Sequence, residues 1–227
     1  MADYYSHPNR TGIFPPVVQA LLIGNVAVFL VQGLGGMSLI QTFALWPLGT
    51  PRYIEGGIIG LQEVPRFELW QLVTYSFLHG NLLHLFFNMF ALWMFGSLIE
   101  TVWGSRRFLV YYFACVIGAA VAQLIVASSQ ADGIYPTIGA SGGVFGILLA
   151  FGMRFPNQYI LLLIPPIPIK AKWFVLIYGA IELYLGITGT QAGVAHFAHL
   201  GGMLAGLLLI LYWRGRLPWK PRHPELW

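Results

Sequence analysis

TIGASGGVFGILLAFGMR, residues 137–154, is the most informative stretch of this sequence. After its glycine-rich start, an apolar run of 13 residues leads from Ser141 to the charged Arg154. A membrane-spanning helix needs about 20 apolar residues. The run therefore predicts a helix that begins near Ser141 within a membrane and does not cross all of it. The glycine-rich loop before it must then enter the membrane where other parts of the protein cover it.

Five further apolar runs accompany this one. The chain has 227 residues, is 57% hydrophobic and is only 9% charged, whereas an average soluble domain is about 25% charged. The six predicted spans lie near 15–34, 78–98, 108–127, 141–153, 172–187 and 194–213. We expect an all-α integral membrane protein of six helices, with a cytoplasmic segment at 1–14, a membrane domain at 15–213 and a cytoplasmic tail at 214–227. The N-terminus has no pattern of a removable signal peptide.

The Lys and Arg residues divide unevenly between the two sides of such a bundle. Six spans put both termini on one side, together with Arg10, Arg106, Arg107, Arg154, Lys170, Lys172, Arg214, Arg216, Lys220 and Arg222. Only Arg52 and Arg66 fall on the other side. Cytoplasmic loops carry an excess of Lys and Arg, so we predict cytoplasmic termini and a multi-pass protein of the inner cell membrane. This topology explains the net charge of +4 better than a nucleic-acid partner does.

The two longest connections show different patterns. Residues 35–77 mix charged and aromatic side chains, which favours a structure lying in the membrane interface. The link FPNQYILLLIPPIPIK, residues 155–170, contains four prolines and cannot be a regular helix throughout.

The single cysteine, Cys115, is interpreted as a small packed residue, because one cysteine alone cannot form a disulfide within the chain.

Four polar residues in three of the runs fall at one depth in the membrane: His84, Asn88, Ser141 and His199. Each run ends at a charged anchor. Counting back at about 1.5 Å per residue places the four roughly 18–24 Å from those anchors, inside a hydrocarbon core about 30 Å thick. Polar groups are costly within lipid, so their position at a single depth predicts a functional site.

Ser141 and His199 have the chemistry of a nucleophile and a general base. Free N–H groups at the start of a helix favour the negative charge that develops during attack. Small residues on both helices would let them approach closely: Gly142, Gly146, Gly202, Ala205 and Gly206. His199 could then take the hydroxyl proton and return it to a leaving amine. Each motif alone is also compatible with simple packing, and His196 is a rival base one turn nearer the outer surface.

His84 and Asn88 are four residues apart and share one helix face. Attack on an amide makes an oxyanion, and their side chains could donate hydrogen bonds to it together with the Ser141 N–H. The alternative is that the pair only ties its helix to a neighbour. His79 falls at the outer interface and is interpreted as structural, linking the outer loop to the core.

The carboxylates have no assigned chemistry. None is placed at the active depth, so we expect a Ser–His dyad without an orienting acid, with Phe145 able to stack on the base instead. Glu182 is interpreted as protonated, bonded to a neighbour or facing a wet cavity. Glu100, with Arg106 and Arg107 nearby, is interpreted as part of an ion-pair cluster at the interface.

Three segments together resemble the rhomboid intramembrane serine proteases: LHLFFNM at 83–89, GASGGVFG at 139–146 and AHLGG at 198–202. The resemblance covers roughly residues 60–210 and implies a bacterial-type bundle of six transmembrane helices. By position it implies that Ser141 is the nucleophile and His199 the base. It implies that His84 and Asn88 are the oxyanion donors and that Phe145 is the aromatic stacked on the base. It also implies single-span transmembrane substrates, cut near the outer face at a small residue in a helix that unwinds easily. Rhomboids often have Trp-Arg where this chain has Trp70-Gln71. This difference bears on how the outer loop is held in place and not on the chemistry.

Three other functions remain as alternatives. A rhomboid-like pseudoprotease would bind membrane helices without cutting, and loss of the serine or histidine would be its signature. A transporter would show paired discontinuous helices in two related halves, and this sequence has one short span and no repeat. Metal hydrolysis would need a suitable ligand set. Neither histidine pair, 79/84 or 196/199, has a neighbouring carboxylate ligand or a His-Glu-x-x-His spacing. We expect no cofactor and no metal.

Overall fold

The computed structural model describes residues 15–55, 61–128, 135–162, 166–189 and 194–219. Within them, five helical segments are long and apolar enough to cross a membrane: α1 (Pro16–Gly35), the continuous segment Leu82–Trp103, α6 (Ser105–Ser128), α8 (Ala171–Thr188) and α9 (His196–Trp213). The shorter apolar helix α7 (Ser141–Arg154) completes the bundle. The prediction of six helices with a short fourth one is confirmed. The tails at 1–14 and 220–227, with Arg10, Lys220 and Arg222, lie outside the described residues.

The second segment begins later than predicted and changes its winding. It consists of α4 (Leu82–Ala91), the π-helical turn η3 (Leu92–Gly96) and α5 (Ser97–Trp103). The predicted start near 78 is wrong because Asn81 caps α4, its side-chain oxygen accepting the His84 backbone N–H at 2.8 Å. Gly104, with φ of 80°, ends α5 and lets α6 begin at Ser105 instead of 108.

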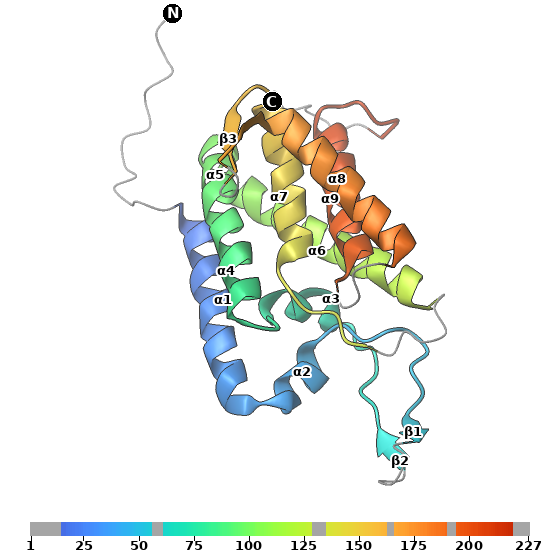
Figure 1. Ribbon diagram of the computed structural model, residues 1–227. Helices are drawn as coiled ribbons and strands as arrows, with labels where there is room; N and C mark the ends of the chain where they lie inside the picture. Colours follow the sequence, from blue (N-terminus) through green and yellow to red (C-terminus); the bar gives the residue numbers. More distant parts are fainter. Residues whose placement is uncertain (1–14, 56–60, 129–134, 163–165, 190–193, 220–227) are drawn as a thin grey trace, which may run out of the picture.

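Helix α7 lies in the middle of the bundle, between α6, α8 and α9 (Figure 1). Small residues allow this packing, because a Cβ on Gly202 of α9 would overlap the Gly142 carbonyl of α7. A Cβ on Gly146 would likewise overlap the Cys115 side chain of α6. The predicted contact between α7 and α9 is therefore confirmed at Gly142 and Gly202. Ala205 and Gly206 instead face α6, where they lie against Gly118 and Tyr111. Cys115 is buried, as expected of a packed residue.

Short elements form the two ends of the bundle (Figure 1). The connection between α1 and α4 contains α2 (Met37–Phe43), the antiparallel strands β1 (Tyr53–Glu55) and β2 (Leu61–Glu63), α3 (Gln71–Thr74) and the turn η2 (Tyr75–Phe77). At the opposite end, the antiparallel strands β3 (Tyr159–Leu161) and β4 (Pro168–Lys170) join α7 to α8. The proline-rich link is thus not a helix in its described residues, as predicted.

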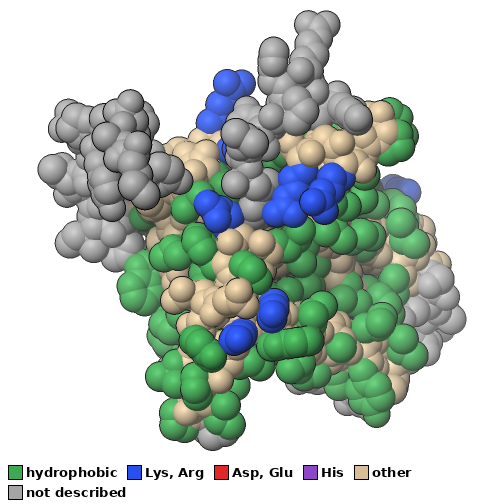
Figure 2. Space-filling model, turned by 90° about the horizontal axis from the view of Figure 1, so that it is seen from above, with side chains coloured by type: hydrophobic (Ala, Val, Ile, Leu, Met, Phe, Trp, Pro, Cys, Tyr) green, Lys and Arg blue, Asp and Glu red, His purple; other side chains and the backbone are tan. Residues whose placement is uncertain are grey.

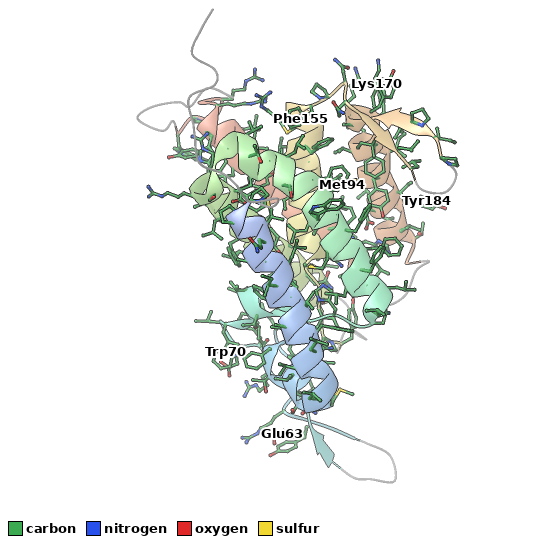
Figure 3. All side chains as sticks on the ribbon, turned by 90° about the vertical axis from the view of Figure 1, so that its left-hand side faces the viewer. Glu63, Trp70, Met94, Phe155, Lys170 and Tyr184 are labelled. Carbon is green, nitrogen blue, oxygen red and sulfur yellow. The ribbon has the colours of Figure 1, made fainter. Side chains whose placement is uncertain are left out.

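Basic side chains gather at the end of the molecule that carries β3 and β4 (Figure 2). They come from the start of α6, the end of α7, the start of α8 and the end of α9: Arg106, Arg107, Arg154, Lys170, Lys172, Arg214 and Arg216. Phe155 and Lys170 lie at this end in Figure 3, and Glu63 and Trp70 lie at the other. The two ends therefore differ in charge, which is the asymmetry on which the predicted orientation depends.

Glu100, in the middle of α5, does not belong to the ion-pair cluster that the sequence suggested. Its side chain is fully buried, and its two oxygens accept the backbone N–H groups of Val17 at 3.1 Å and Val18 at 2.8 Å. The Ser105 hydroxyl donates a third bond at 2.7 Å. The first N–H groups of a helix lack partners within it and favour negative charge. Glu100 therefore caps α1 from a distant part of the sequence.

Candidate active site

The start of α7 positions Ser141. Gly139, two residues before Ser141, has φ of 128°, a backbone conformation that a side chain strongly disfavours. A Cβ there would lie 2.8 Å from the ring of His84 and 3.6 Å from the Ser141 hydroxyl, so only glycine fits between them. The first hydrogen bond of the helix runs from the Val144 N–H to the Ala140 carbonyl. The N–H groups of residues 141–143 come before this bond, in the first turn of the helix. The predicted helix start near Ser141 is confirmed.

The loop before Ser141 is covered by protein. Thr137 and Leu45 pair through two backbone hydrogen bonds of 2.9 and 3.0 Å, and the Gly139 N–H donates to the Tyr75 carbonyl at 3.0 Å. The Tyr75 side chain is buried and donates to the Val116 carbonyl of α6 at 2.8 Å. These bonds satisfy backbone groups that would otherwise be costly within a membrane. The connection between α1 and α4, together with α6, therefore fixes the position of the serine.

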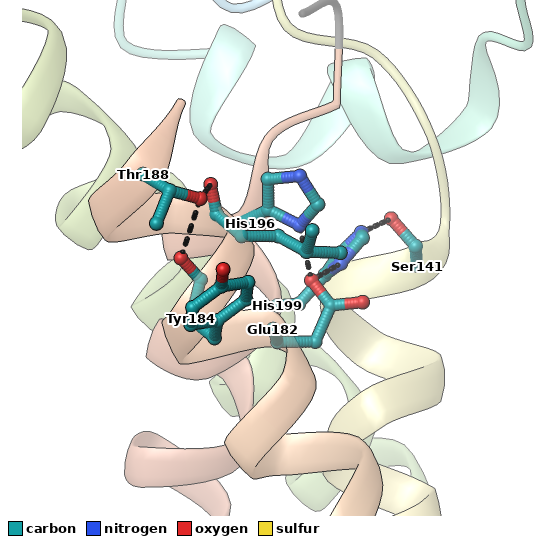
Figure 4. Close-up of polar contacts among 7 residues, drawn as sticks. Ser141, Glu182, Tyr184, Thr188, His196 and His199 are labelled. Atoms are coloured by element: carbon teal, nitrogen blue, oxygen red, sulfur yellow. Dashed lines mark hydrogen bonds and ion pairs between the residues drawn. The ribbon is translucent and has the colours of Figure 1, made fainter. Parts of the chain in front are cut away.

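Ser141 and His199 meet across the contact between α7 and α9. The Ser141 Oγ lies 2.8 Å from Nε2 of His199, within hydrogen-bond range (Figure 4). The close approach of the two backbones at Gly142 and Gly202 allows this distance. Gly142 directly follows Ser141, and Gly202 lies one helical turn after His199. The structure thus brings together the two residues that the sequence singled out as nucleophile and base.

A column of stacked rings lies against His199. The Phe145 ring is stacked on the imidazole with a centroid distance of 4.2 Å and an interplanar angle of 6°. Tyr178 stacks on the other face of Phe145 at 5.3 Å, and Phe174 stacks on Tyr178 at 5.5 Å. The expected contact between Phe145 and the His199 ring is present. The column fixes the plane of the imidazole.

Glu182 contradicts two expectations from the sequence. Its Oε2 lies 2.8 Å from Nδ1 of His199 and 2.7 Å from Nδ1 of His196 (Figure 4). A carboxylate therefore is present at the active depth, and the pair His196/His199 does have an acidic neighbour. The depth count contained the signal: Glu182 is 12 residues beyond Lys170, or about 18 Å along α8. His196 contacts this carboxylate, whereas the hydroxyl of Ser141 is bonded to His199.

His84 and Asn88 line the same cavity as Ser141 and His199. The cavity has a volume of about 710 Å³ and is walled mainly by apolar residues of α4, α7 and α8, including Phe87, Phe90, Leu148 and Phe174. The Asn88 amide donates one bond to the His84 carbonyl at 2.8 Å. The imidazole of His84 faces Gly139, next to the serine. All four polar residues predicted at one depth therefore border one space.

Gln71 and His79 hold the connection between α1 and α4 in place. The Gln71 side chain is buried, accepts the Trp46 N–H at 3.2 Å and donates to the carbonyls of Arg66 and Thr42 at 3.1 and 3.3 Å. Thus glutamine pins this connection where many rhomboids have arginine. The backbone of His79 exchanges two hydrogen bonds with the Gln32 side chain of α1, which confirms its predicted structural link. Burial, with a smaller effect from His84, lowers the pKa of His79 to about 4.

Comparison with known proteins supports the likeness suggested by the three sequence segments. The family model described as Rhomboid domain matches residues 66–216, which is about two thirds of the chain. The chain is 32% identical to yeast (Saccharomyces cerevisiae) "Rhomboid protein 1, mitochondrial" over 126 residues, covering 55% of this chain and 36% of that protein. It is 32% identical to "Rhomboid protease GluP" of Bacillus subtilis over 128 residues, covering 54% and 22%.

A human relative matches a longer region. "Presenilin-associated rhomboid-like protein, mitochondrial" of Homo sapiens is 32% identical over 152 residues, covering 65% of this chain and 39% of that protein. The chain thus spans well under half the length of these curated relatives. The similarity concerns the membrane domain that contains the four polar residues, because the family match begins before α3 and ends after α9.

Proposed function

This chain belongs to the rhomboid family, and we propose from that premise that it is a serine protease that cuts other membrane proteins within the lipid bilayer. The observation that carries the proposal is the 2.8 Å contact between Ser141 Oγ and His199 Nε2 at a cavity walled mainly by apolar residues. A hydroxyl is a weak nucleophile until a neighbouring base accepts its proton. One relative, from Bacillus subtilis, is named a rhomboid protease.

The proposed reaction is acyl transfer in two steps. The Ser141 oxygen attacks the scissile carbonyl carbon while its proton passes to Nε2 of His199. The imidazolium then gives this proton to the amide nitrogen, the C–N bond breaks, and the amine product leaves an acyl-enzyme. Water then attacks the ester carbonyl carbon while one of its protons passes to Nε2 of His199. The C–O bond to Ser141 breaks, the imidazolium returns the proton to the serine oxygen, and the product leaves as a carboxylic acid. This sequence conserves atoms and needs no cofactor.

The proposed oxyanion donors are Asn88, His84 and the backbone N–H of Ser141. Each attack places negative charge on the carbonyl oxygen, which donors fixed in a site of low dielectric stabilise strongly. Asn88 retains a second amide hydrogen after its bond to the His84 carbonyl. His84 borders the same cavity, and the Ser141 N–H precedes the first helical bond. The shared cavity that His84, Asn88 and Ser141 line supports this proposal.

Single-span transmembrane proteins are the proposed substrates. The cavity is walled mainly by apolar side chains, which suits a segment that enters from lipid. We propose that the protein lies in the inner cell membrane, and the basic end of the bundle supports an orientation with both termini in the cytoplasm. Relatives occur in mitochondria as well as in Bacillus subtilis, and cell fractionation with marker proteins tests the placement.

The proposal is tested by cleavage of a panel of tagged single-span proteins in detergent and in vesicles. Ser141→Ala and His199→Ala should each abolish cleavage, and the double variant should be no worse than either, because the pair acts as a unit. Ser141→Ala should also prevent labelling by a fluorophosphonate. Ser128→Ala, an exposed serine at the end of α6, is the matched control.

A pseudoprotease gives the opposite result. Such a protein would bind the substrates in a pull-down, leave every one of them uncut and take up no fluorophosphonate. Cleavage by Ser141→Ala at the parent rate would also overturn the proposed mechanism.

A further inference from the structure

Glu182 and two histidines form a buried polar cluster behind the serine. The carboxylate comes from α8, and His196 and His199 come from the first turn of α9 (Figure 4). All three residues are buried, each less than a tenth exposed. One oxygen, Oε2, makes both contacts, at 2.7 Å to Nδ1 of His196 and 2.8 Å to Nδ1 of His199. A buried carboxylate needs compensation of this kind.

The direction of these bonds determines which nitrogen of His199 carries the proton. An ionised carboxylate only accepts hydrogen bonds, so both imidazoles must present an N–H at Nδ1. The other nitrogen of His199, Nε2, then has a free lone pair, and it faces the Ser141 hydroxyl at 2.8 Å. This is the tautomer that a general base requires.

We propose that Glu182 is the positioning residue of the base, so that the site works as a Ser141–His199–Glu182 triad with His196 as a second anchor for the carboxylate. The proposal rests on the proposed protease function. Glu182 fixes the tautomer of His199 and compensates the positive charge that His199 gains when it takes the serine proton. At this depth water screens charge poorly, so compensation is worth more than at a surface.

Phe145 and Glu182 constrain the imidazole in different ways. The stacked Phe145 ring restricts tilting of the imidazole plane but leaves rotation within that plane free. The bond from Nδ1 to Glu182 removes this rotation and keeps Nε2 aimed at the serine. His196 bonds the same carboxylate oxygen and so limits the motion of Glu182. The base is therefore held in both plane and direction.

Glu182→Gln is the main test. Glutamine has nearly the same shape but no charge, and its amide can donate to Nδ1 and favour the wrong tautomer. We expect kcat to fall by about 10²–10⁴-fold, as in triads whose acid becomes an amide, with little change in KM. Glu100→Gln is the matched control, because it makes the same substitution at a buried carboxylate that caps α1. That variant should lose thermal stability and keep its kcat.

A spectroscopic measurement separates positioning from folding. Nitrogen-15 NMR of histidine-labelled protein distinguishes Nδ1–H from Nε2–H tautomers, and the His199 signals are identified by their loss in His199→Ala. We expect His199 to be protonated at Nδ1 in the parent and in Glu100→Gln, and to lose this preference in Glu182→Gln. The parent spectrum alone tests the proposal if Glu182→Gln does not fold.

Three results would overturn this assignment. One is full kcat in Glu182→Gln while Ser141→Ala is inactive, which leaves the protease function intact. Another is an Nε2–H tautomer of His199 in the parent. A third is loss of parent activity on treatment with a metal chelator, since the same three side chains would then serve as metal ligands. An active Ser141→Ala variant, by contrast, would overturn the protease function itself.

Discussion

At the scale of single residues, Asn88 shows how a side chain can serve its own helix and the cavity at once. One amide hydrogen bonds the carbonyl of His84, four residues earlier, and the side chain also borders the cavity. Asn25 makes the same bond within α1, to the carbonyl of Leu21 at 2.7 Å, and does not border the cavity. Asn88 therefore has access to the cavity that contains Ser141, and Asn25 does not.

Asn88→Ala should therefore slow cleavage without abolishing it. Removing one oxyanion donor costs about 10²–10³-fold in kcat, and the remaining donors should still support slow turnover. Fluorophosphonate labelling of Ser141 should persist at a reduced rate. The measurement is kcat on at least two substrates, with Asn25→Ala as the control that loses the same kind of bond. Equal kcat values for the parent and Asn88→Ala would assign Asn88 to packing only.

The sequence predicts the four polar residues of the cavity better than their partners. Depth follows from counting along single helices, so His84, Asn88, Ser141 and His199 could be grouped without a structure. The bond from Glu182 to two histidines depends instead on how α8 is rotated against α9, and apolar periodicity in a membrane does not specify that rotation. The cap that Glu100 provides for α1 was missed for a different reason, since the two segments are remote in sequence.

At the scale of elements, the contact between α7 and α9 determines the geometry of the site. The helices touch backbone to backbone where Gly142 meets Gly202, three residues beyond His199. Apolar side chains give little drive for association within lipid, so close packing of small residues is what joins these helices. Small–xxx–small spacing made this contact predictable. The π-helical turn at Leu92–Gly96 had no comparable signal in the sequence.

Gly202→Ala should separate the serine from its base. The added methyl group would overlap the Gly142 carbonyl, so α9 must move away from α7. Overpacking of this kind costs about 1–3 kcal/mol, and the longer distance between the Ser141 and His199 side chains should lower kcat at least tenfold. Thermal unfolding and cleavage assays measure the two effects.

Gly33→Ala is the matched control for this variant. Gly33 lies in α1 with no atoms near the position of an added Cβ, so the substitution should leave kcat unchanged. A Gly202→Ala variant with the stability and turnover of Gly33→Ala would show that the helix contact tolerates a side chain.

At the scale of the whole molecule, charge distinguishes the two ends of the bundle. The end that carries β3 and β4 presents a group of basic side chains, whereas the end with β1 and β2 contains the exposed ion pair Arg52–Glu63 at 3.2 Å. An exposed pair of this type contributes little to stability. The asymmetry therefore matters for orientation in the membrane, where loops rich in Lys and Arg stay in the cytoplasm.

Labelling with a membrane-impermeant maleimide tests this orientation. Glu63→Cys should react in sealed, right-side-out vesicles, and Arg216→Cys should react only after the vesicles are opened. The parent provides a silent background, because its single cysteine, Cys115, is buried. The reverse labelling pattern would invert the topology and remove the basis for every depth count made from the basic anchors.

The cap on α1 has a consequence for the order in which the protein is assembled. The carboxylate of Glu100 lies 82 residues after the N–H group of Val18 that it binds. At a synthesis rate of about 5–20 residues per second, the ribosome makes Glu100 about 4–16 seconds after Val18. During that interval α1 depends on lipid and on its own hydrophobicity to remain inserted. Helix α1 thus acquires this cap only after the segment that contains Glu100 has been made.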